Sequence, residues 1–229
     1  MKKLKINRIP IDIFDEYVAD YLFKKLKILE DGNNKINIAL SGGKTPLPIL
    51  FKLKDFSLKW EIFNFFLTDE RNVPLKSKES NFGNLSNVFF NKITSKSFSI
   101  IKNGTNINES ITHYKKEIFN SIKEYHNNIP VFDLILLGMG SDGHIASLFP
   151  KSKGLEESKD IIILNKIHKL NTDRITMTYP ILLNAKEIVT IIKGKEKEKV
   201  LLNIQNKRVT NYPVHKITEH PNNIFLLGI

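Results

Sequence analysis

The residues best suited to chemistry stand in a glycine-rich turn, Gly138-Met-Gly-Ser-Asp-Gly-His144. We expect a helix to begin at His144, so that the imidazole faces a ligand and the helix dipole keeps it neutral and able to accept a proton. Asp142, two residues earlier, would orient the ring or an attacking water. The alternative is that His144 caps a helix and that Asp142 binds the N–H groups of its own loop. We favour the histidine base.

A second glycine-rich loop follows an apolar segment and has the sequence Ser41-Gly42-Gly43-Lys44-Thr45. Glycines let the backbone present its N–H groups, and a helix N-terminus favours an anion. With Thr45 as N-cap and Pro46 first in the helix, the loop predicts a phosphate cradle. The spacing of a Walker A loop is missing. An ordinary strand-to-helix turn is the alternative.

Cationic side chains occur in three further segments. Thr68-Asp69-Glu70-Arg71 places a guanidinium and two carboxylates at the end of an apolar segment. The rigid fork of an arginine suits a phosphate or a developing oxyanion. Arg174 and Lys193 could complete a phosphate site. The alternatives are a local salt-bridge cluster around Arg71 and solvated surface charges at the other two positions.

Neither a dinucleotide nor a metal is expected. Gly138, Gly140 and Gly143 form a loose G-x-G-x-x-G, but the adjoining Asp-Gly-His is unsuited to a pyrophosphate. The chain has no cysteine and no His-x-x-x-His pair. We interpret the remaining histidines as surface or capping residues: His113, His126, His168, His215 and His220.

Alternating apolar segments and amphipathic stretches must position these loops. Strands are predicted at 36–40, 62–68, 131–137, 161–164, 188–192 and 224–227. Helices are predicted at 13–29, from Thr45 onward, at 83–90 and 107–125, and after the strands 161–164 and 188–192. This alternation predicts an α/β fold whose mostly parallel sheet has helices on both faces. The loops that begin at Ser41, Asp69 and Gly138 would then share the carboxyl edge, where such sheets bind ligands.

Length and composition fit one α/β domain over residues 1–229, with two small domains as the alternative. The formal net charge of +11 suits an anionic partner. Because the lysines are scattered and no aromatic residues interleave with them, we expect compositional bias and no nucleic-acid binding. No signal peptide and no membrane-spanning segment are expected, which together with the lack of cysteine predicts a cytoplasmic protein.

Together, these segments resemble the 6-phosphogluconolactonase family, in the family's order and over about residues 36–200. The matching pieces are Ser41-Gly-Gly-Lys-Thr-Pro46, Thr68-Asp-Glu-Arg71 with Ser80-Asn81, Gly138-Met-Gly-Ser-Asp-Gly-His-Ile-Ala-Ser-Leu-Phe-Pro150, Arg174-Ile-Thr-Met-Thr178 and Lys193-Gly-Lys-Glu-Lys197. Any one piece is weak, whereas the ordered set is specific.

The resemblance implies a Rossmann-like fold and hydrolysis of 6-phosphoglucono-1,5-lactone in the oxidative pentose phosphate pathway, without metal or organic cofactor. It makes His144 the general base, with Asp142 as its neighbour. The groups that it assigns to the anionic substrate are the 41–45 loop, Asp69, Arg71, Asn81, Arg174 and Lys193. The partner would be a small phosphorylated sugar lactone, bound by a monomer or a homodimer.

Two alternatives remain besides a basic nucleic-acid binder, which the net charge of +11 suggests. Amino-sugar-phosphate deaminases share the Asp-Gly-His, but their motif continues with Asn-Glu-Pro, where this chain has Leu148-Phe149-Pro150. Since a phenylalanine cannot move protons, the lactonase is favoured. A non-catalytic sugar-phosphate-binding module is the other alternative. The chain departs from the family in lacking proline between Asn165 and Asp173, and in ending at Leu227-Gly-Ile229.

Overall fold

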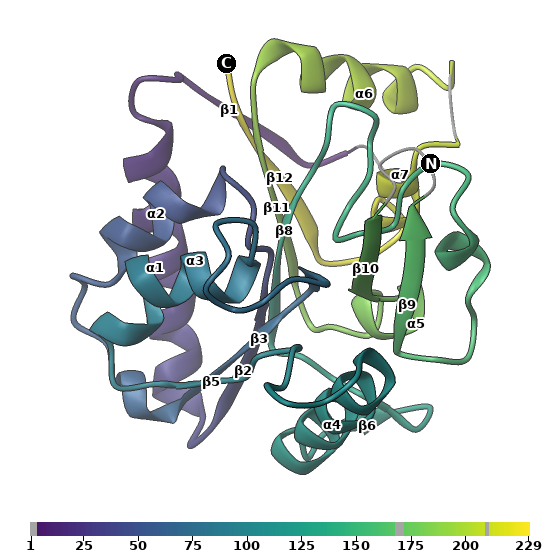
Figure 1. The fold of residues 1–229 in the computed structure, drawn as a ribbon. Coiled ribbons are helices and arrows are strands. Elements are labelled where there is room, and N and C mark those ends of the chain that lie inside the picture. The colour runs from purple at the N-terminus through teal and green to yellow at the C-terminus, as the bar shows by residue number, and fades with distance from the viewer. Residues whose placement is uncertain (1–3, 168–171, 209–210) are drawn as a thin grey trace.

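The computed structural model describes residues 4–167, 172–208 and 211–229. Its main sheet has seven strands in the order β1-β12-β11-β8-β2-β3-β5, and each neighbouring pair is parallel (Figure 1). These strands are β1 (Ile6–Ile9), β2 (Ile36–Leu40), β3 (Phe63–Leu67), β5 (Lys96–Ser97), β8 (Leu134–Gly138), β11 (Ile188–Lys193) and β12 (Asn223–Gly228). The predicted α/β fold with a mostly parallel sheet is confirmed.

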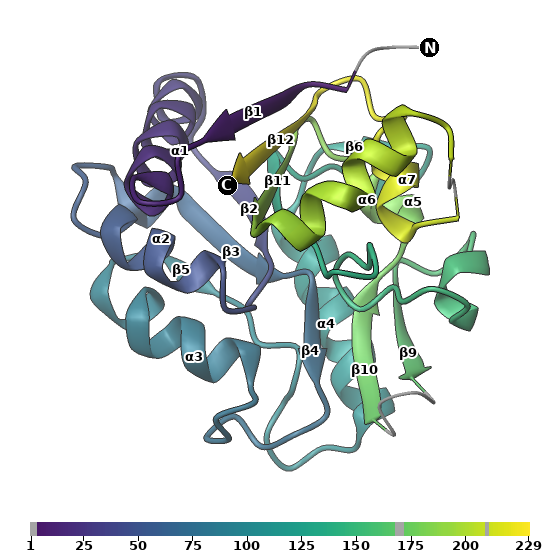
Figure 2. The ribbon, with the colours of Figure 1, turned by 90° about the horizontal axis from the view of Figure 1, so that it is seen from above.

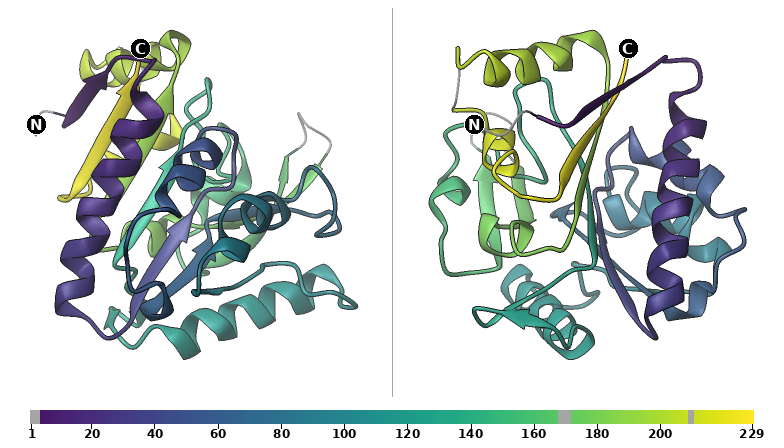
Figure 3. Two further views of the ribbon diagram at one scale, coloured as in Figure 1. Left: turned by 90° about the vertical axis from the view of Figure 1, so that its left-hand side faces the viewer. Right: turned by 180° about the vertical axis from the view of Figure 1, so that it is seen from behind.

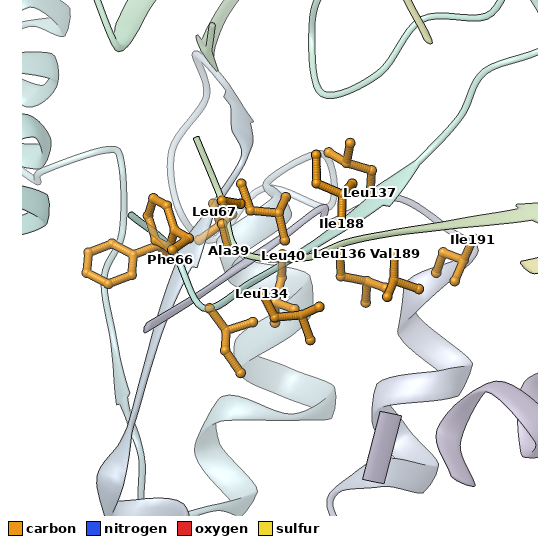
Figure 4. Packing of buried hydrophobic residues seen from close by; sticks show 14 of the residues in the cluster. Ala39, Leu40, Phe66, Leu67, Leu134, Leu136, Leu137, Ile188, Val189 and Ile191 are labelled. Atoms are coloured by element: carbon orange, nitrogen blue, oxygen red, sulfur yellow. The ribbon is translucent and has the colours of Figure 1, made fainter. Parts of the chain in front are cut away.

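The inner strands are apolar because both of their faces are covered. Every residue of β2 and of β3 is buried. Their side chains pack against those of β8 and β11, among them Leu40, Leu67, Leu136 and Val189 (Figure 4). This packed centre fixes where each strand ends, and therefore where the loops after the strands begin.

Helices lie on both sides of the sheet, as Figures 2 and 3 show. One side carries α1 (Phe14–Gly32), α2 (Pro46–Leu53) and α3 (Asn81–Val88). The other side carries α4 (Ile107–Ser121), α5 (Tyr179–Leu182), α6 (Lys195–Gln205) and α7 (Pro213–Ile217). Short 3-10 turns lie at Trp60–Ile62, Phe90–Lys92 and Lys153–Glu156, and β6 (Tyr125–His126) pairs with β7 (Ile129–Pro130).

A second, three-stranded sheet lies beside the carboxyl edge of the main sheet (Figure 2). It consists of β4 (Asp69–Arg71), β10 (Thr172–Met177) and β9 (Ile162–Ile167), paired antiparallel in the order β4-β10-β9. The helix predicted after residues 161–164 is therefore wrong. The β-branched residues Thr172, Ile175 and Thr176 favour a strand at this place.

Other differences from the prediction are local. The edge strand β1 has only one fully buried residue, Ile9, so its sequence lacks a clear apolar pattern. Helix α3 begins at Asn81 and not at Gly83, because the Ser80 side chain accepts a hydrogen bond from the Gly83 N–H as an N-cap. Helix α4 ends at Ser121, four residues before the predicted end at Tyr125.

The strand order reverses between β2 and β8. From β2 the chain proceeds outward through β3 and β5, and from β8 it proceeds the other way through β11 and β12. Ligands of open α/β sheets bind beyond the carboxyl ends of the strands at such a reversal. The loop after β2 and the loop after β8 flank this point. Within the described ranges, no helix has the length and apolar character needed to cross a membrane.

Candidate active site

A cavity of about 440 Å³ lies at the reversal point. Its lining brings together the loops after β2 and β8, both strands of the β4–β10 pair, and the first turns of α2, α3 and α6. The predicted residues that line it are Ser41, Gly43, Lys44, Thr45, Asp69, Arg71, Asn81, His144 and Arg174. Further lining residues are Pro46, Gly138, Met139, Gly140, Ala146, Ser147, Phe149 and Lys197.

His144 is held by a carboxylate and an aromatic ring. Its Nδ1 lies 2.6 Å from Oδ1 of Asp142, and its backbone N–H donates to the same oxygen at 3.2 Å. The Phe149 ring stacks on the imidazole with 4.1 Å between the centroids. Burial favours a higher pKa for Asp142, but the hydrogen bond and the charge of His144 outweigh burial and lower the pKa of this carboxyl. Because Nδ1 is engaged, Nε2 is the nitrogen that a substrate can meet.

The helix predicted to begin at His144 is wrong. Residues 141–150 form turns and isolated bridges, in which Ile145 pairs with Met139 and with Leu148. The dipole argument for a neutral imidazole therefore does not apply. Since Ile145 and Leu148 are fully buried, the loop is fixed by the core in place of helical hydrogen bonds. The contact between Asp142 and Nδ1 fits the predicted role of Asp142 in orienting the ring.

Two glycines permit close packing around the site. A Cβ at Gly140 would lie 2.2 Å from both Cε1 and Nδ1 of His144, so only glycine leaves room for the ring. A Cβ at Gly42 would lie 2.4 Å from Cβ of Asn81. Gly42, unlike its loop neighbours, thus contacts α3 and does not line the cavity. The 41–45 loop reaches the cavity through Ser41 and residues 43–45.

Thr45 and Pro46 occupy the predicted N-cap and first helical positions of α2, but the Thr45 side chain makes no capping hydrogen bond.

Arg71 and Arg174 lie directly opposite each other in the β4–β10 pair. Burial and the neighbouring Arg71 charge lower the pKa of Arg174. The Nε atoms of both arginines are buried and have no hydrogen-bond partner within the described part of the chain. Like charges directly opposite each other on a sheet are destabilising. An anion between the two guanidinium groups would relieve the repulsion and satisfy these donors.

A buried glutamate, which the sequence analysis did not single out, fixes Arg71 and the start of α3. Oε1 of Glu70 accepts hydrogen bonds from the N–H groups of Arg71 and Asn81, both at 2.7 Å. Oε2 accepts from Phe82 N–H and from the Ser80 hydroxyl. Burial raises the pKa of Glu70, whereas these hydrogen bonds act against the rise. An acidic residue facing a helix N-terminus was the signal available in the sequence.

Lys193 does not lie in the cavity. Its Nζ is 2.9 Å from both carboxylate oxygens of Asp15, and it stands over the Phe14 ring. As the last residue of β11, it emerges on the side covered by α1. Lys197, in the first turn of α6, lines the cavity from the same Lys-Gly-Lys-Glu-Lys segment. The predicted segment therefore reaches the cavity through Lys197 and not through Lys193.

Asn81 and Asp69 both line the cavity and are joined by a hydrogen bond. The Asn81 Nδ2 donates to the Asp69 backbone oxygen at 2.9 Å. The Asp69 carboxylate accepts hydrogen bonds from the hydroxyls of Thr68 and Ser147. Ser147 is a second residue that sequence reasoning missed, because a single serine between apolar residues carries no pattern.

Among the described residues, His144 is the one histidine that lines the cavity. His220 is buried, and its Nε2 contacts the Ala185 carbonyl oxygen at 2.8 Å, so of the two predicted roles, surface or capping, the surface position is wrong. His168 lies outside the described residues. Over those residues, no three His, Cys, Asp or Glu side chains gather so that they could hold a metal ion.

Comparison with known proteins gives one consistent family. The model of the family described as glucosamine-6-phosphate isomerases/6-phosphogluconolactonase matches residues 13–226. A 6-phosphogluconolactonase of Thermotoga maritima is 33% identical over 188 residues, which cover 81% of this chain and 82% of that protein. A probable 6-phosphogluconolactonase of Dictyostelium discoideum is 35% identical over 228 residues, covering 94% of this chain and 95% of that protein.

Solved structures agree. The crystal structure of the Thermotoga maritima 6-phosphogluconolactonase superposes with a TM-score of 0.87 and 29% identity, covering 99% of this chain and 100% of that one. The 6-phosphogluconolactonase of Trypanosoma cruzi gives a TM-score of 0.85 and 26% identity, covering 99% and 94%. The chain therefore belongs to the glucosamine-6-phosphate isomerase/6-phosphogluconolactonase family.

Proposed function

We propose that this chain hydrolyses 6-phospho-D-glucono-1,5-lactone to 6-phospho-D-gluconate in the oxidative pentose phosphate pathway. The relatives named as 6-phosphogluconolactonases support this reaction. The single observation that carries it is the pairing of His144 with Asp142 in a cavity that also contains the opposed Arg71 and Arg174. A base and an anion site in one cavity suit hydrolysis of a phosphorylated ester.

In this proposal the phosphate binds to the cationic side of the cavity. Arg71 and Arg174 supply buried guanidinium donors, and Lys44 and Lys197 add charge. The N–H groups of residues 43–45 precede α2, whose N-terminus favours an anion. Several charged donors held on different elements fix the position of the phosphate, and thereby the distance from the lactone carbonyl to His144.

The chemical step uses His144 as a general base. Its Nε2 takes a proton from a water molecule, whose oxygen bonds to the carbonyl carbon and forms a tetrahedral oxyanion. The imidazolium is stabilised by Asp142 through Nδ1. As the bond from this carbon to the ring oxygen breaks, His144 returns the proton to that oxygen. The products are a free hydroxyl and a carboxylic acid, which ionises.

Phe149, whose ring stacks on His144, favours the lactonase over a deaminase. Phe149 occupies the position where deaminases have their glutamate, and here its ring stacks on the imidazole and lines the cavity. A hydrocarbon ring covers one face of the base but cannot transfer a proton. Ring opening and isomerisation of an amino sugar need such a second proton carrier, whereas hydrolysis of a lactone needs only one base.

The test is hydrolysis of freshly prepared 6-phosphogluconolactone, followed by pH-stat with the spontaneous rate subtracted. We expect the protein to accelerate hydrolysis and to release no ammonia from glucosamine 6-phosphate. Ammonia release without lactone hydrolysis would contradict the proposal in favour of the deaminase. Cytoplasmic location, a single domain over 1–229 and a monomeric or homodimeric state remain parts of this proposal.

A further inference from the structure

One wall of the cavity consists of three polar side chains that are almost fully buried: Ser41, Asp69 and Ser147. We propose that this wall can only accept hydrogen bonds, so that it recognises hydroxyl groups of the substrate and excludes its phosphate. The inference rests on the proposed function and assigns a specificity to part of the same site. It also removes Ser41 from the group of phosphate donors predicted from sequence.

Both hydrogen-bond donors of Ser41 are committed within the protein. Its backbone N–H donates to the Leu136 carbonyl at 2.9 Å and so joins β2 to β8. Its Oγ lies 2.9 Å from Oγ1 of Thr68. Geometry alone leaves open which hydroxyl of this pair donates, but the next contact along the chain of hydroxyls decides it.

The Thr68 hydroxyl points to the Asp69 carboxylate. Its Oγ1 lies 3.1 Å from Oδ1 of Asp69. A carboxylate only accepts hydrogen bonds, and a hydroxyl has one proton to give. A hydrogen bond to an ionised acceptor is stronger than one between neutral hydroxyls. Thr68 therefore donates to Asp69, and Ser41 must donate to Thr68, which leaves only lone pairs of Ser41 Oγ toward the cavity.

Ser147 reaches the same carboxylate from the other side. Its Oγ donates to Oδ2 of Asp69 at 2.7 Å, and its N–H donates to Oγ1 of Thr176 at 3.1 Å. The Ser147 carbonyl accepts from Asn165 Nδ2 at 2.8 Å. The backbone of Ser147 is thus held on both sides, and its hydroxyl proton faces Asp69. Toward the cavity, Ser147 also offers only an acceptor.

Burial of Ser41, Asp69 and Ser147 favours this one arrangement of their hydrogen bonds. Ser41, Asp69 and Ser147 expose only 6%, 7% and 2% of their surfaces, and all three line the cavity. Turning the Ser147 hydroxyl outward to a ligand would remove one of the two hydroxyl donors of the Asp69 carboxylate. Turning the Ser41 hydroxyl outward would remove the donor to Thr68, and losing a buried hydrogen bond is costly. We therefore expect the hydroxyl protons to keep this orientation when a ligand binds.

The consequence is that the cavity offers two unlike sets of side chains, the acceptors of this wall and the guanidinium groups of Arg71 and Arg174. A phosphate oxygen accepts hydrogen bonds and carries negative charge, so the wall with Asp69 repels it, whereas Arg71 and Arg174 attract it. A sugar hydroxyl can donate to the wall. A lactone in which the contacted hydroxyl is replaced by hydrogen or by a carbonyl would leave buried acceptors unpaired, which is how such sites discriminate.

The experiment is calorimetric titration with inorganic phosphate and with 6-phosphogluconate at pH 8, using the wild type, S41A, S147A and R174A. We expect S41A and S147A to keep the Kd for inorganic phosphate within about twofold of the wild type. Each should raise the Kd for 6-phosphogluconate about fivefold, as loss of one neutral hydrogen bond does. R174A should weaken both ligands, because it removes a phosphate donor.

Weakening of inorganic phosphate by S41A as strong as that by R174A would overturn the inference, since it would show Ser41 donating to phosphate. Unchanged affinity of both serine variants for 6-phosphogluconate would also overturn it. Ser41 and Ser147 lie in different loops, so the two variants test the acceptor wall independently of each other. These titrations need no catalysis, so failure of lactone hydrolysis would contradict the proposed function separately.

Discussion

Arg71 on β4 and Arg174 on β10 face each other across an antiparallel pair, with the Nε atoms of both buried. Both arginines line the cavity, so an anion that enters it can lie between their guanidinium groups. Burial and the Arg71 charge lower the pKa of Arg174, and a phosphate beside the two guanidinium groups would act against both effects.

Replacing Arg174 with alanine should impair recognition of the phosphate selectively. Hydrogen bonds to charged groups contribute about 1.5–3 kcal/mol, so we expect KM for 6-phosphogluconolactone to rise about tenfold or more. KM for unphosphorylated gluconolactone should change little. Lys193→Ala is the matched control, because Lys193 pairs with Asp15 outside the cavity. An equal rise of KM for both lactones in R174A would remove the phosphate assignment.

Replacing Gly140 with alanine should displace the base. The new methyl would lie 2.2 Å from Cε1 and Nδ1 of His144, so the ring must move. Displacement of a catalytic group by about 1 Å can reduce the rate about a hundredfold, and we expect such a loss in kcat with little change in KM. Gly32→Ala is the control, since a Cβ there meets nothing within 4 Å. Normal kcat in G140A would show that the position of this ring is not critical.

The Asp142–His144 pair makes stability depend on pH in a defined direction. The pKa of Asp142 is lowered in the folded protein, so the contribution of this carboxyl is present above its unfolded pKa of about 3.9. The contribution is lost as the pH falls through the lower folded pKa. Denaturation by urea between pH 2 and 6 should therefore show a stability difference between wild type and Asp142→Asn that shrinks at the acid end. A difference that grows toward low pH would contradict the assigned direction.

Sequence patterns predicted most of the site because parallel strands end at one edge. The loops after β2, β3 and β8 were each found from an apolar run followed by glycine or charge, and the sheet brings them together at the reversal point. The pairing of Arg71 with Arg174 could not be predicted, because it depends on the antiparallel register of two segments about a hundred residues apart.

The predictions that the structure contradicts also failed for physical reasons, because they depend on packing that a local sequence pattern does not contain. The helix expected at His144 is replaced by turns because Ile145 and Leu148 enter the core. Lys193 and Lys197 are both lysines of one short basic segment, so the sequence does not distinguish them. The turn from β11 into α6 decides which of them lines the cavity. The direction that we propose for the Ser41 hydroxyl likewise depends on Thr68 and Asp69, which follow it by more than twenty residues.

The most direct test of this account is the kcat of His144→Gln on 6-phosphogluconolactone, with the spontaneous rate subtracted. Glutamine keeps the approximate length and polarity of the side chain but cannot accept the proton from water. A positioned base contributes about 10²–10⁴-fold, so we predict that the variant retains less than about a tenth of the wild-type kcat while its affinity for 6-phosphogluconate is preserved. A folded variant that retains more than this would contradict the assignment of His144 as the base.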